Sequence, residues 1–174
     1  MRLTAFTDYS LRVLIYLGTN PDRRATIAEV AQTFGISESH LTKVVHFLGL
    51  QGWLANVRGK GGGMQLALEA RHIVIGRVVR ATEGEAVPAE CFGVDAHGCC
   101  ILKGCRLRGV LREAVDAFHA VLDRYTLDDL VRNREALAQM LNLPPPVAPT
   151  EVVPIVAAAR VRRPRAHPRS GRPG

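Results

Sequence analysis

The sequence predicts a mainly α-helical chain with a small β wing. Three observations lead to this fold class. Two short amphipathic helical patterns are separated by a turn at Gly35, two short β-type runs enclose a glycine-rich segment, and an apolar heptad pattern extends from Leu107 to Tyr125. A helix-turn-helix followed by a hairpin is a winged helix-turn-helix, and a heptad seam is typical of a helix that pairs with a second copy. We therefore expect a winged helix-turn-helix plus a long dimerisation helix.

The composition supports a folded core and a polyanionic partner. Of the 174 residues, 47% are apolar, which excludes a collagen-like or wholly disordered chain. No apolar run approaches the roughly 20 residues that span a bilayer, and the N-terminus lacks the pattern of a signal peptide. We therefore expect a cytoplasmic protein with no membrane partner.

The chain carries 23 Lys and Arg against 16 Asp and Glu, and this basic balance indicates a polyanionic partner.

Each helix of the first region has a recognisable beginning. The first helix is expected over residues 7–17, with Thr7 as its cap. The second opens with a capping box, in which Thr26 caps the helix and Glu29 reaches back to it. The third is capped by Ser37 and repeats apolar residues at the spacing of a buried helix face. These apolar residues are Leu41, Val44, Val45 and Leu48.

The outward face of the third helix is polar and weakly basic, as expected of a helix that reads DNA. Its candidate DNA-binding residues are Ser39, His40, Thr42 and Lys43. The strands expected next, residues 53–57 and 64–68, enclose a glycine-rich loop that can approach a phosphate chain closely. Arg58 and Lys60 supply its positive charge. An ordinary flexible hairpin and a nucleotide-binding loop are the alternatives, but a nucleotide-binding loop should open a helix, and here a strand follows.

The second half of the chain combines further helices with a loop. Residues 71–83 predict an amphipathic helix, and the glycine-containing residues 91–105 predict a loop. The heptad seam then follows, formed by Leu107, Leu111, Ala114, Phe118, Val121 and Tyr125. This seam favours a homodimer over the core helix of a monomer, because inverted-repeat operators require a two-fold protein. Thr126 and Asp129 resemble a capping box that starts a short helix ending at Leu141.

The chain is expected to have three regions. Residues 1–70 form the winged helix-turn-helix DNA-binding region, and residues 71–143 carry the cysteine loop and the dimerisation helices. Residues 144–174 are rich in proline and arginine and hold six arginines against one glutamate. We expect this tail to be disordered, because it has little to bury and strong self-repulsion.

Four cysteines lie close together in the sequence, and they are Cys91, Cys99, Cys100 and Cys105. In a reducing compartment such a group is more often metal-binding or redox-active than a disulfide framework. An iron–sulfur cluster suits the wide spacing, whereas tetrahedral zinc needs four closed ligands and would have to recruit His97. A thiol switch and inert cysteines are further alternatives.

Three segments resemble the bacterial winged-helix iron–sulfur regulators, and within that family its nitric-oxide-sensing repressors. These segments are Thr7-Asp8-Tyr9, the loop Arg58–Gly63, and Cys99-x5-Cys105-Arg106-Leu107. The resemblance extends from Met1 to about Leu143, and the run Tyr125–Leu130 is also typical of this group.

The resemblance implies a homodimeric repressor of nitrosative-stress genes. Such a repressor binds an inverted-repeat operator in double-stranded DNA and releases it on nitrosylation of its cluster. By this pattern Cys91, Cys99 and Cys105 would ligate a 4Fe–4S or 2Fe–2S cluster, and the partner's Asp8 would be a fourth, oxygen ligand where the cluster is 4Fe–4S. The seven residues between the first two of these cysteines are more than relatives have, and Cys100 has no counterpart.

Two alternative functions follow from the same residues. An iron–sulfur-status regulator of the same family would carry a histidine three residues after the last cysteine, where this chain has Arg108. A zinc-stabilised DNA-binding module is the alternative from a different class, and metal analysis separates it from a cluster protein. An enzyme is not expected, because no Ser-His-Asp or paired-carboxylate set stands out.

Overall fold

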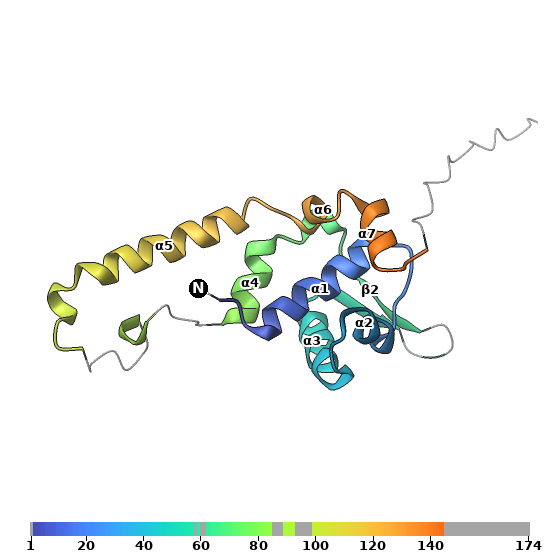
Figure 1. Ribbon diagram of the computed structural model, residues 1–174, viewed down its shortest axis with the longest axis horizontal. Coiled ribbons are helices and arrows are strands. Elements are labelled where there is room, and N and C mark those ends of the chain that lie inside the picture. Colours follow the sequence, from blue (N-terminus) through green and yellow to red (C-terminus); the bar gives the residue numbers. More distant parts are fainter. Residues whose placement is uncertain (1, 58, 60–61, 85–88, 93–98, 145–174) are drawn as a thin grey trace, which may run out of the picture.

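The computed structural model describes residues 2–57, 59, 62–84, 89–92 and 99–144. Its elements follow the chain as α1 (Ala5–Thr19), α2 (Ile27–Phe34), α3 (Glu38–Leu50), β1 (Leu54–Val57), β2 (Gly63–Leu66), η1 (Ala70–His72), α4 (Ile75–Glu83), η2 (Glu90–Phe92), η4 (Leu102–Gly104), α5 (Arg106–Leu122), α6 (Leu127–Leu130) and α7 (Arg134–Met140). Figure 1 shows a helical body, with one two-stranded hairpin, from which the long α5 reaches away. The predicted fold class, mainly α with a small β wing, is confirmed.

The first helix begins earlier than the sequence predicts. Thr4 is its cap, and the Thr4 hydroxyl accepts a hydrogen bond from the Thr7 backbone N–H at 3.2 Å. Thr7 itself is buried inside the helix, and its hydroxyl donates to Thr82 of α4 at 2.9 Å. The prediction of Thr7 as the cap was therefore wrong, because a tertiary contact with α4 claims that side chain.

The start of α2 confirms half of the predicted capping box. The Thr26 hydroxyl accepts from the Glu29 backbone N–H at 3.2 Å. The Glu29 carboxylate turns away and instead accepts from the Tyr16 hydroxyl at 2.8 Å and pairs with Arg23 at 2.5 Å. This carboxylate therefore joins α2 to α1 and to the loop between them.

The turn and the wing follow the predicted pattern closely. Gly35 ends α2 in the left-handed region with φ +64°, and the Ser37 side chain accepts from His40 N to cap α3. Strands β1 and β2 pair antiparallel with Leu54 opposite Leu66. Each strand is one residue shorter than expected, and β2 begins at Gly63, one residue earlier than expected, and ends at Leu66. Gly63 has no room for a side chain, because a Cβ there would lie 2.8 Å from the Ala25 carbonyl oxygen.

One hydrophobic core joins α1, α2, α3, the hairpin, α4 and α6. Its fully buried side chains include Val13, Leu14, Val30, Leu41, Leu48, Ile73, Val78 and Leu127. The side chain of Leu127 packs against α1 at Gly18, where a Cβ would lie 3.3 Å from it. The body is thus closed on one side by the short helix that follows α5 in sequence.

The predicted helix over residues 71–83 is divided in two. The turn η1 precedes α4, and between them Val74 forms a β-bridge with Thr126. The Leu127 N–H also donates to the Ile73 carbonyl oxygen at 2.8 Å. These extended contacts hold residues 73 and 74 out of the helix, so the first residues of the predicted helix form only the short turn η1 and not a continuation of α4.

The last segment confirms the capping box and corrects the helix that follows it. The Thr126 hydroxyl accepts from the Asp129 N–H, and the Asp129 carboxylate accepts from the Thr126 N–H at 2.8 Å. The helix does not continue to Leu141, because it ends at Leu130 and a new helix begins at Arg134.

The long helix α5 differs from the other long helices of the described residues, because none of its residues is buried. Its C-terminal end is fixed to α4 by an ion pair between Arg80 and Asp123 and by close packing at Gly76, where a Cβ would overlap the Asp123 side chain. No helix in the described residues is long and apolar enough to cross a membrane.

Candidate DNA-binding surface and cysteine segment

The exposed face of α3 carries the predicted DNA-binding residues. Four predicted residues are exposed, whereas Leu41 between them and Val44 after them are buried in the core. The exposed residues are Ser39, His40, Thr42 and Lys43. The Thr42 hydroxyl donates to the Glu38 carbonyl oxygen at 2.8 Å, so toward a ligand it presents its methyl group and its acceptor lone pairs. The other two predicted residues, Arg58 and Lys60, lie outside the residues that the structure describes.

A hollow of about 560 Å³ separates α3 from the wing. Thr42 and His46 of α3 line one wall, Asn56 and Val57 of β1 line the other, and the start of α2 and Gly59, Gly62 and Gly63 complete it. Sequence analysis did not find Asn56. Asn56 lines the hollow together with His46, and its amide nitrogen would lie 3.5 Å from a Cβ built at Gly49 of α3, so its position follows from the packing of β1 on α3.

Helix α1 supports α3 from behind through aromatic contacts. The ring centroids of Phe6 and Phe47 lie 5.3 Å apart in an edge-to-face arrangement. The rings of Tyr9 and His40 lie 6.4 Å apart, which brings α1 next to a predicted DNA-binding residue. The two helices are thus in direct contact on the side of α3 that carries His40.

In the sequence Asp8 lies between Phe6 and Tyr9, in the first turn of α1. Its carboxylate pairs with Arg12, one turn further along the helix, at 2.8 Å. The Asp8 side chain is 45% exposed, so its oxygens are accessible from outside the protomer. In one protomer Asp8 is thus a surface carboxylate on the helix that supports α3.

The N-terminus of α1 is bound to the C-terminus of α4. The Thr4 backbone N–H donates to the Glu83 carboxylate at 2.9 Å, and the Thr4 hydroxyl does so at 3.1 Å. Partial burial alone would raise the pKa of Glu83, but hydrogen bonds from Thr7 and Thr4 outweigh it and hold this pKa below its ordinary value. The cysteine segment begins only a few residues after Glu83, so this contact between α1 and α4 lies next to that segment in the sequence.

The four cysteines occupy two kinds of environment. Cys91 in η2 and Cys105 at the start of α5 are half-buried, whereas Cys99 and Cys100 are exposed, and all four are free thiols. Within the described ranges, no three His, Cys, Asp or Glu side chains are grouped closely enough to hold a metal ion. His97 lies outside these ranges. The predicted ligand set of Cys91, Cys99, Cys105 and the partner's Asp8 therefore stays a prediction.

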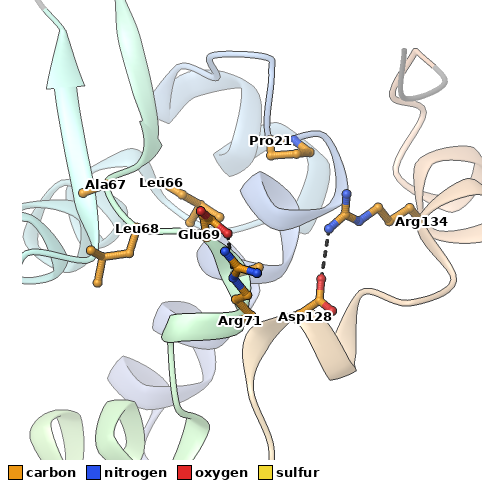
Figure 2. A pocket seen from close by; sticks show the side chains of 9 residues that line it. Pro21, Leu66, Ala67, Leu68, Glu69, Arg71, Asp128 and Arg134 are labelled. Atoms are coloured by element: carbon orange, nitrogen blue, oxygen red, sulfur yellow. Dashed lines mark hydrogen bonds and ion pairs between the residues drawn. The ribbon is translucent and has the colours of Figure 1, made fainter. Parts of the chain in front are cut away.

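A second hollow, of about 430 Å³, lies at the base of the wing near α6 and α7. Figure 2 shows its two arginines, each beside a carboxylate: Arg71 pairs with Glu69 at 2.7 Å and Arg134 with Asp128 at 3.1 Å. Because each cation is already neutralised by its neighbour, this hollow offers no unbalanced charge to a ligand. We assign no function to it.

The fold, the exposed polar face of α3 and the glycine-rich wing define a winged-helix DNA-binding regulator. The chain belongs to the Rrf2 family, described as iron-dependent transcriptional regulators, whose pattern matches residues 3–133. The resemblance noted from the sequence is thereby confirmed. The family consists of transcriptional regulators, so the expectation that the chain is not an enzyme is confirmed as well.

Individual relatives cover most of the chain. It is 45% identical over 144 residues to the HTH-type transcriptional regulator NsrR of Bacillus subtilis strain 168, a match that covers 82% of this chain and 99% of that relative. Among solved structures, CymR, the global cysteine regulator of B. subtilis, is 28% identical with a TM-score of 0.59, covering 76% of this chain and 98% of CymR. IscR of T. potens has a TM-score of 0.63 at 22% identity, covering 79% and 90% of the two chains, and shows the fold alone.

Proposed function

We propose that this protein is a cytoplasmic, homodimeric repressor that senses nitric oxide through an iron–sulfur cluster and releases its operator when the cluster is nitrosylated. The observation that carries the proposal is the position of the cysteine segment. It lies between α4, whose end is bound to α1 by Glu83, and α5, which begins directly after Cys105. A centre built there would be connected to the DNA-binding face through α4 and α1. The similarity to regulators named NsrR supports the same function.

The exposed seam of α5 supports the homodimer. Leu107 is 61% exposed and Val110 60%, although both are large apolar residues. Val121 and Tyr125, at the other end of the seam, are also exposed. Because apolar side chains repeated at heptad spacing are buried when two helices pair, the partner that fits this face is the same helix of a second copy.

The DNA-binding mode follows from the positions of α3 and the wing. If Lys43 and its neighbours enter the major groove and the wing reaches the adjacent minor groove, the sugar–phosphate strand between these grooves must pass between α3 and the wing. The hollow at His46 and Asn56 lies at that place. We therefore assign His46 and Asn56 to backbone contacts, and Ser39, His40, Thr42 and Lys43 to base contacts. Arg58 and Lys60 in the wing would contact phosphate or the minor groove.

The chain's own residues suggest how the centre is coupled to DNA binding. In the proposed dimer Asp8 of one protomer reaches the cysteine segment of the other, which requires it to exchange its pairing with Arg12. Thiolates bind iron firmly, whereas a single carboxylate oxygen is a weaker ligand, so a bound cluster supplies an iron position open to a small ligand such as nitric oxide. Release of Asp8 would remove a restraint on the first turn of α1, where Tyr9 contacts His40 of α3, and would thereby alter the DNA-binding face.

The experiment that tests this function starts from protein purified without oxygen. We expect iron and sulfide in the protein, with visible absorbance that Cys91→Ala, Cys99→Ala and Cys105→Ala each abolish and Cys100→Ala retains. If Cys100→Ala loses the absorbance and Cys99→Ala keeps it, the assigned ligand is wrong by one residue. Zinc without iron or sulfide would contradict the cluster and favour a zinc-stabilised module.

The same preparation tests the regulatory step. A duplex carrying an inverted repeat, selected from random sequence by the cluster-loaded protein, should be bound tightly and released on anaerobic addition of nitric oxide. Binding that does not change on addition of nitric oxide would contradict the sensor function while leaving the protein a DNA-binding regulator.

A further inference from the structure

Phe92 lies directly after Cys91 and contacts two arginines of α5. The guanidinium carbon of Arg108 lies 5.6 Å from the centroid of the Phe92 ring, and that of Arg112 lies 5.4 Å from it. Both distances are within the range of cation–π contacts. Since the two arginines are one helical turn apart and α5 begins directly after Cys105, this stack joins the turn that carries Cys91 to the helix that follows Cys105.

The two arginines carry charge that nothing in the described part of the chain neutralises. The ion pairs of the described residues involve other arginines, and neither Arg108 nor Arg112 takes part in one. Like charges one turn apart destabilise a helix, and here both lie against one ring beside two cysteines. This arrangement is unfavourable in the absence of a negative group at the same place.

A second observation points to the same missing group. The Nε–H of Arg108 is buried and has no hydrogen-bond acceptor within the described residues. A buried donor without an acceptor costs free energy, and such groups are rare unless a ligand or water satisfies them. The N-terminus of α5, where Cys105 is the capping residue and makes no side-chain cap bond, adds the positive end of a helix to the same site.

These residues fit an anionic sulfur-containing centre. A cluster held by three thiolates carries negative charge, and its sulfur atoms accept hydrogen bonds. Building on the function proposed above, we propose that Arg108 is a positioning residue for the iron–sulfur centre and donates its Nε–H to a sulfur of that centre. The Phe92 ring, stacked under Arg108 and Arg112, holds the Cys91 turn at the beginning of α5.

Variants of Arg108 separate its two roles. Arg108→Lys keeps a cation over Phe92 but removes the planar Nε–H donor, and Arg108→Gln removes the cation as well. Arg106→Gln is the matched control, because Arg106 is an exposed arginine in the same turn with no contact to Phe92 among the described residues. For the aromatic partner, Phe92→Tyr keeps the ring face and Phe92→Leu keeps only the apolar bulk.

Two measurements test the hydrogen-bond donor role of Arg108 and the stacking role of Phe92. In cluster-loaded protein we expect Arg108→Lys and Arg108→Gln to lose iron to a chelator roughly 10-fold faster than the wild type, the size of effect typical for partners of metal ligands. In cluster-free protein we expect Phe92→Leu and Arg108→Gln to raise the alkylation rate of Cys91 about fivefold relative to Cys100. Phe92→Tyr, Arg108→Lys and Arg106→Gln should leave that rate unchanged. Far-ultraviolet circular dichroism verifies that each variant is folded.

The outcomes separate this inference from the function on which it rests. If the wild type loads iron and sulfide but all variants match Arg106→Gln in both measurements, Arg108 and Phe92 have no positioning role, while the sensor function stands. If Arg108→Lys retains iron like the wild type, the donor role is wrong and only the stack remains. A wild type that assembles no iron–sulfur centre overturns both the proposed function and the role of Arg108.

Discussion

The winged-helix body and the cysteine segment with α5 are stabilised in opposite ways. The body has a closed core, in which Leu14, Leu41 and Val78 have no exposed surface. The helix α5 is longer than any helix of the body, yet none of its residues is buried. Its C-terminal half contacts the body through Phe118, Leu122 and the ion pair of Asp123, and its beginning carries a cation–π stack. The body thus has its own core within one chain, whereas α5 and the cysteines have the exposed surface that the proposed second copy and bound centre would cover.

The largest effect should come from the core of the body. Leu14→Ala should lower the free energy of unfolding by about 2–5 kcal/mol, because it leaves a cavity among side chains that cannot close it. Urea unfolding followed by circular dichroism measures this loss. The matched control is Leu111→Ala on α5, which should cost much less at concentrations where the protein is monomeric. Equal losses would show that α5 is packed as tightly as the body.

The next largest effect should come from the seam of α5. Leu107→Glu should weaken dimerisation by tenfold or more, about 1.4 kcal/mol for each factor of ten, because it places a charge in the apolar interface. Sedimentation equilibrium at several concentrations gives the dissociation constant. Glu113→Ala on the same helix, away from the seam, should leave it unchanged. A Leu107→Glu protein that dimerises like the wild type would mean that another surface forms the dimer.

A smaller effect should come from the polar link between α1 and α2. Burial alone would raise the pKa of Glu29, but hydrogen bonds from Arg23 and Tyr16 outweigh it and hold this pKa below its ordinary value of 4.5. The folded state therefore keeps the carboxylate charged to lower pH than the unfolded state, so this stabilisation is complete above the ordinary pKa. It is lost as the pH falls through the lowered pKa.

Glu29→Gln tests that link. At neutral pH we expect Glu29→Gln to lower the free energy of unfolding by about 1 kcal/mol. This loss is smaller than for a buried hydrogen bond to a charged group, because Glu29 is partly exposed. Unfolding by urea at about pH 7 and at about pH 3.5 should show that the difference between variant and wild type shrinks at the lower pH. If the difference in free energy of unfolding between variant and wild type is the same at both pH values, the charge of Glu29 does not contribute to stability.

The smallest effect should come from the wing, which belongs to the body and should act on DNA alone. Lys60→Ala should weaken DNA binding across all sequences and reduce the slope of log affinity against log salt by about 0.9 if Lys60 makes one phosphate contact. Cluster absorbance should not change. Fluorescence anisotropy at several salt concentrations measures the slope, and an unchanged slope and affinity would exclude Lys60 from the interface.

Local rules predicted the body well where local contacts decide the structure. The caps at Thr26 and Ser37 and the capping box at Thr126 involve residues within one helical turn, and all three are observed. The rules failed where a distant residue competes for the same side chain. Thr4 and Thr7 are both good caps in sequence, and contacts with α4 decide between them.

The candidate sites show the same limit. The exposed face of α3 follows from helical periodicity, because its polar residues alternate with core residues in a regular way. Asn56 and the stack of Phe92 under Arg108 and Arg112 could not be found in this way. Their partners come from different elements, and no regular spacing in the sequence records contacts between a short turn and a distant helix.

The central claim is that the completed cysteine centre controls the DNA-binding face through Asp8 and α1. The most direct test measures the affinity of an inverted-repeat duplex for cluster-loaded, nitrosylated and cluster-free protein without oxygen, in the wild type, Asp8→Ala and the control Asp22→Ala. We expect nitric oxide to weaken the DNA binding of the wild type and of Asp22→Ala at least tenfold, about 1.4 kcal/mol. We expect a smaller loss of DNA affinity for Asp8→Ala, which keeps three thiolates. Equal affinities of the wild type in all three states would contradict the central claim.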